Sequence, residues 1–113
     1  MQLIAVKLER AMTDDKLFLQ DNLSLNKLSE SISETENHIS ETFSQFLNTK
    51  FFQFVNGFRV EEAKKALQES DKLVTNIAFD VGFNSKSTFN TAFKKAGGYS
   101  PSAYRKLPFE NKE

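Results

Sequence analysis

The 113-residue chain contains no cysteine or tryptophan and only one histidine, two prolines and four glycines. Because cysteine is absent, disulfides, thiolate chemistry and zinc ribbons are excluded. The single histidine, His38, argues against a histidine-based metal site or catalytic triad. No apolar run reaches 18 residues, and the N-terminus lacks the apolar core of a signal peptide. These absences predict a soluble, cytoplasmic protein with no segment in a membrane.

Patterns typical of enzymes are missing as well. The sequence shows no nucleophile paired with a base, no glycine-rich phosphate loop and no pair of carboxylates placed by an evident turn. We therefore predict that the chain is not an enzyme and that it uses no cofactor or metal.

Phenylalanine and a split charge distribution are what the sequence does contain. Twelve phenylalanines and a hydrophobic fraction of 39% are enough for one small core. The net charge is zero, which on its own argues against nucleic-acid binding. However, residues 1–49 carry four basic and eight acidic side chains, whereas residues 50–113 carry eleven basic and seven acidic ones. The second half is therefore basic.

Apolar residues recur with the helical period of 3.6 along the chain, and no useful stretch alternates with period 2. We predict an all-α fold of about seven helices, with Leu17–Leu19 as an extended, buried connector. Ser24, Thr35, Ser85 and Ser100 are the predicted N-caps. The predicted helices cover residues 3–12, 25–32, 36–48, 50–69, 74–81, 86–96 and a short segment from Pro101.

Two segments repeat one plan, a short helix, a tight turn, a hydroxyl N-cap and a longer amphipathic helix. They read LNKLSESISETENHISETFSQF (residues 25–46) and LVTNIAFDVGFNSKSTFNTAFKK (residues 73–95). This is the pattern of a helix-turn-helix, written twice. We expect Ile39, Phe43 and Phe46 to point inward in the first segment, and Phe89 and Phe93 in the second.

The outward faces of the two longer helices then carry short polar side chains. These are Asn37, Ser40, Glu41 and Ser44 in the first, and Lys86, Ser87, Asn90, Thr91 and Lys94 in the second. Such faces suit the major groove of DNA. A 20-residue helix between them would span ~30 Å, close to the ~34 Å between major-groove segments on one side of a duplex.

The sequence resembles the DNA-binding module of the AraC/XylS family of bacterial transcription regulators. The resemblance is carried by VEEAKKALQES and IAFDVGFNSKSTFNTAFKKAGGYSPSAYRK, and more loosely by LSLNKLSESIS, NHISETFSQF and FFQFVNGFRV. It implies a single module over residues 1–113, with helix-turn-helix units at 1–48 and 70–113 joined by a linker helix at 49–69. Double-stranded DNA and RNA polymerase are the implied partners, and the family's module usually follows a sensing or dimerising portion.

The resemblance also implies roles for particular residues. The implied base contacts are Asn37, Ser40 and Glu41 in the first unit and Lys86, Ser87, Thr88, Asn90 and Thr91 in the second. The implied phosphate contacts are Thr35, Arg59, Ser85 and Lys94. Unlike many members, this chain has no Lys or Arg between Lys27 and Lys50. We therefore expect the second unit to carry most of the affinity. The neutral charge and acidic first half leave open the alternative of a helical module that binds proteins and has little affinity for DNA.

Overall fold

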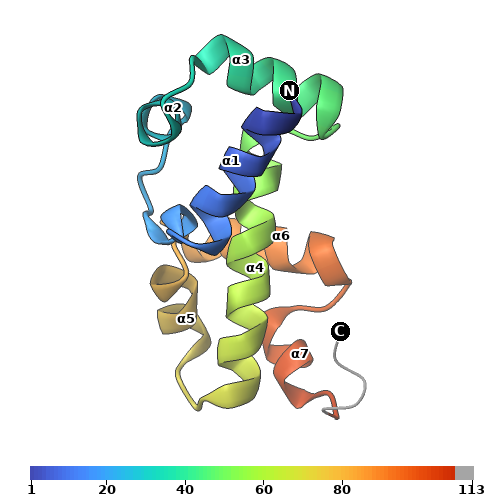
Figure 1. The fold of residues 1–113 in the computed structure, drawn as a ribbon. Coiled ribbons are helices and arrows are strands. Elements are labelled where there is room, and N and C mark those ends of the chain that lie inside the picture. Colours follow the sequence, from blue (N-terminus) through green and yellow to red (C-terminus); the bar gives the residue numbers. More distant parts are fainter. Residues whose placement is uncertain (109–113) are drawn as a thin grey trace.

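Seven α-helices and no strand occur in residues 1–108, which are the residues that the computed structural model describes (Figure 1). The helices are α1 (Gln2–Thr13), α2 (Leu25–Ile32), α3 (Glu36–Glu41), α4 (Phe51–Glu69), α5 (Val74–Asp80), α6 (Lys86–Gly97) and α7 (Pro101–Lys106). A 3₁₀ turn η1 (Leu17–Leu19) follows α1, and a π-helical turn η2 (Thr42–Phe46) continues α3. The all-α, seven-helix prediction is confirmed. Residues 109–113 of the predicted second unit lie outside the described residues.

The four predicted N-caps are confirmed by side-chain hydrogen bonds to backbone N–H groups. The pairs are Ser24 with Lys27 at 3.1 Å, Thr35 with His38 at 3.1 Å, Ser85 with Thr88 at 3.1 Å and Ser100 with Ala103 at 3.2 Å. Each hydroxyl satisfies a donor that the helix itself leaves free. The caps therefore define where α2, α3, α6 and α7 begin.

The long helix α4 belongs to two hydrophobic clusters. Its residue Val55 packs in a first cluster with buried side chains of α1, η1, α2, α3 and η2. Its residues Val60, Ala63 and Leu67 pack in a second cluster with α5, α6 and α7. In Figure 1, α3 lies at the upper end of the molecule and α6 crosses α4 lower down. With 19 residues, α4 spans about 28 Å, and it holds the two clusters apart along its length.

Phe46 does not point inward as predicted, since its side chain is 50% exposed. The cause is the π-helical turn η2, in which the Leu47 N–H donates to the Thr42 carbonyl five residues back. A wider turn shifts the side-chain register, so Ile39 and Phe43 stay buried and Phe46 does not.

The prediction of an extended, buried connector at Leu17–Leu19 is also wrong. The segment is a 3₁₀ turn, closed by the Leu19 and Gln20 N–H groups donating to the Lys16 and Leu17 carbonyls. Only Phe18 is buried, while Leu19 is 40% exposed. The turn directs the Phe18 and Gln20 carbonyls toward α4, where they accept hydrogen bonds from Arg59.

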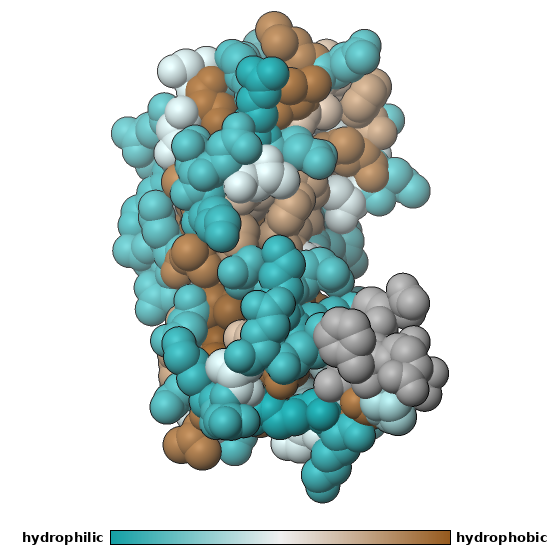
Figure 2. All heavy atoms as spheres, turned by 60° about the horizontal axis from the view of Figure 1, so that its bottom comes forward, coloured by the Kyte–Doolittle hydropathy of each residue, from teal (hydrophilic) through white to brown (hydrophobic). Residues whose placement is uncertain are grey.

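Hydrophilic side chains cover most of the face that Figure 2 shows, and apolar side chains gather between them in separate groups. None of the helices in residues 1–108 has the length and apolar character that crossing a membrane requires.

Candidate nucleic-acid interface

Helix α6 is fixed to the second cluster by a row of aromatic rings. The ring centroids of Phe83 and Phe89 are 5.3 Å apart, those of Phe89 and Phe93 are 5.7 Å apart, and those of Phe93 and Tyr104 are 5.4 Å apart. All four side chains are buried. Edge-on and tilted aromatic contacts of this kind fix orientation as well as burying area. These contacts fix the rotation of α6 about its own axis, and so they determine the direction in which its outer face points.

The outer face of α6 is polar and basic. All the predicted contact side chains of this helix are exposed, namely Lys86, Ser87, Thr88, Asn90, Thr91 and Lys94. The helix contains three lysines and no acidic residue. None of these lysines forms an ion pair within the described part of the chain. This face therefore offers hydrogen-bond donors and positive charge together.

Helix α3 presents a different face. Asn37, Ser40 and Glu41 are exposed, as expected, because Ile39 is buried on the opposite side. Glu36, in the first turn, accepts a hydrogen bond from the Asn26 amide of α2 at 3.2 Å. The helix has two glutamates and no lysine or arginine. Its face therefore repels phosphates, while its amide and hydroxyl groups remain suited to base edges.

The turn between α2 and α3 is tied to α1 by one ion pair. The Lys7 ammonium donates to Glu34 at 2.6 Å and to the Ile32 carbonyl at 3.4 Å. The hydrogen bond from Lys7 lowers the pKa of Glu34, and partial burial opposes this effect. Because Glu34 directly precedes the N-cap Thr35, the pair fixes the point at which α3 starts.

The Lys7–Glu34 pair gives a pH prediction. A carboxyl group with a lowered folded-state pKa stabilises the fold above its unfolded pKa, and this contribution is lost as the pH falls through the folded-state value. We expect Lys7→Met to unfold at lower urea concentration than the wild type at pH 7. The difference between the two proteins should shrink once the pH falls below the ordinary glutamate value of 4.5. A difference that stays constant down to pH 3 would contradict this role.

Arg59 lies largely in the interior, a position that does not favour the phosphate contact predicted for it. Its side chain is only 7% exposed. Nε donates to the Phe18 carbonyl at 2.7 Å and Nη2 to the Gln20 carbonyl at 2.8 Å. Nη1 donates to Oδ1 of Asn56 at 3.1 Å. Burial lowers the pKa of Arg59, and the carboxylate of Asp21 opposes the shift. Arg59 therefore joins α4 to the η1 segment.

Thr35 and Ser85, the other hydroxyl residues predicted at phosphates, both act as N-caps in the structure. Ser85 Oγ is also hydrogen-bonded to Thr88 Oγ1 at 2.8 Å. An N-cap places a hydroxyl beside a helix N-terminus, where the helix dipole favours anions. Their phosphate contacts stay a prediction.

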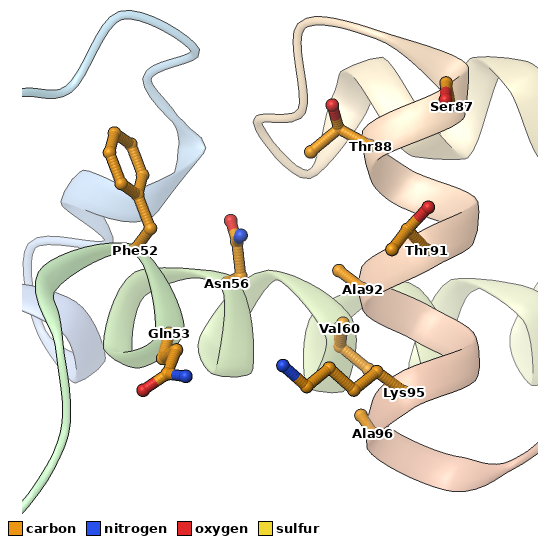
Figure 3. Close-up of a pocket in the computed structure, with 10 residues that line it drawn as sticks. All are labelled: Phe52, Gln53, Asn56, Val60, Ser87, Thr88, Thr91, Ala92, Lys95 and Ala96. Carbon is orange, nitrogen blue, oxygen red and sulfur yellow. The ribbon is translucent and has the colours of Figure 1, made fainter.

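A cleft of about 540 Å³ between α4 and α6 contains side chains that the sequence did not indicate (Figure 3). Lys95 extends across it from α6 toward α4, and Gln53 and Asn56 line the opposite wall. The helical spacing could have indicated Lys95, since residues 88, 91 and 95 lie on one side of a helix. The predicted contact residues Ser87, Thr88 and Thr91 line the same cleft.

Residues 28–107 match the model of a family described as a helix-turn-helix domain, and they make up more than half of the chain. The protein is therefore a helix-turn-helix DNA-binding domain of a transcription regulator. More particularly, the chain belongs to the AraC-type family of bacterial transcription regulators, as its sequence indicated. This is a family of regulators and not of enzymes.

Relatives with similar sequences are longer proteins. An uncharacterized HTH-type transcriptional regulator of Staphylococcus aureus is 37% identical over 90 residues, which are 80% of this chain and 12% of that protein. The melibiose operon regulatory protein of Escherichia coli K12 is 29% identical over 91 residues, which are 80% of this chain and 30% of that protein. The chain thus spans a minor part of the length of each.

Solved structures share the fold over nearly the whole chain. The C-terminal domain of AraT, a response regulator from Geobacillus stearothermophilus, has a TM-score of 0.77 and 30% identity, covering 95% of this chain and 91% of that one. The DNA-binding domain of AdpA, solved in complex with a target DNA, has a TM-score of 0.75 and 23% identity, covering 89% and 87%. The second likeness establishes the fold alone.

Proposed function

We propose that this domain binds double-stranded DNA sequence-specifically, with α3 and α6 in adjacent segments of the major groove, and that it thereby regulates bacterial transcription. The two reading units are residues 1–48 and 70–113, and α4 sets the distance between them. AdpA, whose domain has this fold, is itself described on a target DNA. The observation that carries the proposal is the exposed face of α6, which has three lysines, several hydroxyls, one amide and no carboxylate, and is held at a fixed angle by buried aromatic rings.

The two units contribute unequally in this proposal. On α6, the positive charges of Lys86 and Lys94 attract the duplex, and Lys94 contacts phosphate. The side chains that reach base edges are Lys86, Ser87, Thr88, Asn90 and Thr91. On α3, Glu41 accepts from cytosine N4 but adds no attraction to the backbone. The second unit therefore supplies most of the affinity, and the first supplies discrimination. RNA polymerase and a preceding sensing or dimerising portion remain predicted partners.

Substituting the α6 lysines tests this division. We expect Lys86→Ala and Lys94→Ala each to weaken binding roughly fivefold and to reduce the slope of log affinity against log salt by about one unit, because each removes one cation that displaces a counterion. Titration of a labelled duplex at several salt concentrations measures both quantities.

The matched control is Glu41→Ala on α3, which removes a negative charge instead of a positive one. We expect it to leave the affinity for random duplex unchanged or to raise it. If Glu41→Ala abolishes binding while both lysine variants bind normally, the roles of the two units are reversed and the proposal is wrong.

A further inference from the structure

The cleft between α4 and α6 has apolar walls, to which Phe52, Val60, Ala92 and Ala96 contribute, and every polar side chain that lines it can donate a hydrogen bond. Lys95 contributes an ammonium group, which has no ion-pair partner within the described residues. Ser87, Thr88 and Thr91 contribute hydroxyls, and no carboxylate lines the cleft. A site of this composition favours an anionic oxygen, since it supplies donors and one positive charge.

The Asn56 amide is held in the orientation that adds another donor. Its Oδ1 already accepts from Nη1 of Arg59 at 3.1 Å. Arg59 is in turn fixed by the carbonyls of Phe18 and Gln20, at 2.7 and 2.8 Å. Because Oδ1 is occupied on the side of Arg59, the Nδ2 group is left to donate outward. Figure 3 shows the Asn56 side chain rising from α4 toward the space between Phe52 and Thr88.

The position of the cleft relates this donor set to DNA. Three of its lining residues, Ser87, Thr88 and Thr91, belong to the face of α6 that is proposed to read base edges. With α6 in the major groove as proposed, phosphates flank the bases that it contacts, and the cleft offers hydrogen-bond donors on the side of α6 toward α4. Amides and ammonium groups are common phosphate contacts, and such contacts fix register without reading sequence.

We propose that the α4–α6 cleft binds one phosphate of the DNA strand that runs between α3 and α6. We call this the phosphate site. Asn56 Nδ2 and Lys95 Nζ hold the phosphate oxygens, and Arg59 acts through Asn56 as a positioning residue. This inference rests on the proposed function. It makes α4 part of the interface in addition to its role as a spacer.

Two substitutions test the phosphate site. Asn56→Asp keeps an oxygen for Arg59 to bond but replaces the outward donor by a carboxylate oxygen, so we expect roughly tenfold weaker DNA binding. Lys95→Gln should weaken binding roughly fivefold and lower the salt slope by about one unit. Both effects should be equal on specific and random duplexes, and urea unfolding should show both variants folded.

The controls carry the same chemical changes elsewhere. Lys65→Gln alters an exposed lysine nine residues along α4 from Asn56, on the opposite side of the helix. Asn22→Asp alters an exposed asparagine outside the helices. We expect both controls to bind like the wild type, apart from the small effect of one unit of net charge.

A duplex carrying a single neutral methylphosphonate identifies the phosphate itself. If the phosphate site exists, this replacement at one position weakens DNA binding by the wild type. At the same position it has little further effect on DNA binding by Lys95→Gln. If the wild type binds DNA but the cleft variants have the same DNA affinity as their controls, the phosphate site is refuted and the proposed function stands. If the wild type binds no duplex at low salt, the proposed function is wrong, and the phosphate site, which depends on it, is wrong as well.

Discussion

Gly82→Ala is expected to destabilise the domain by about 3 to 5 kcal/mol, because it combines backbone strain with a steric clash. Gly82 has a φ of +109°, a conformation that residues with a Cβ rarely adopt. A Cβ at this position would lie 2.1 Å from the Phe18 carbonyl oxygen and 2.8 Å from Nε of Arg59. The carbonyl belongs to the backbone, so it cannot move aside without breaking its hydrogen bond to Arg59.

Urea unfolding followed by circular dichroism measures this effect. The matched control is Gly57→Ala, which places the same methyl group in the middle of α4, where no atom beyond the adjacent helix backbone lies within 4 Å. Alanine is the better helix former, so this control should gain about 0.5 to 1 kcal/mol. Equal stability of the two variants would show that the turn after α5 has room to relax.

Arg59→Met is the second large effect, with an expected loss of about 3 kcal/mol. Methionine fills most of the space but donates nothing, so it leaves the carbonyls of Phe18 and Gln20 without their charged donor. The guanidinium also lies over the Phe83 ring, 5.6 Å from its centroid. Arg59 thus ties η1 and α4 of the first cluster to the turn that leads into α6.

Two further measurements separate this role from a direct contact with DNA. Arg59→Lys keeps the charge but cannot bond both carbonyls and Asn56 together, so it should lose nearly as much stability as Arg59→Met. Combined with Gly82→Ala, Arg59→Met should cost less than the sum of the two single changes, because both act on the same contact. If Arg59→Met instead retains full stability and only lowers the salt slope of DNA binding, Arg59 is a phosphate contact after all.

Local chemistry explains how much of the fold could be predicted from the sequence. A cap such as Ser85 needs only a backbone N–H three residues away, and Gly82 needs only a turn that requires a positive φ. The repeated helix-turn-helix pattern then fixed the order of the elements and the outward faces of α3 and α6. These features depend on neighbours within one or two helical turns, so the sequence shows them directly.

Long-range contacts account for what could not be predicted. Arg59 was expected to contact DNA from the surface of α4, but two of its three acceptors, the Phe18 and Gln20 carbonyls, lie about 40 residues earlier. They belong to a segment that was itself expected to be extended. Phe46 follows the helical spacing, but the π-helical turn shifts it outward. Lys95 and Asn56 lie on different helices, and only the packing of α4 against α6 brings them to one cleft.

Selection of bound duplexes from a random pool by the 113-residue chain tests the central claim most directly. Two reading helices on α4 predict enrichment of two short motifs whose centres are one helical turn apart. The motif read by α6 should be the more strongly enriched, and it should weaken in a pool selected by Lys86→Ala. A pool from which no duplex is enriched, even at low salt, would contradict the account and would leave a helical module that binds proteins.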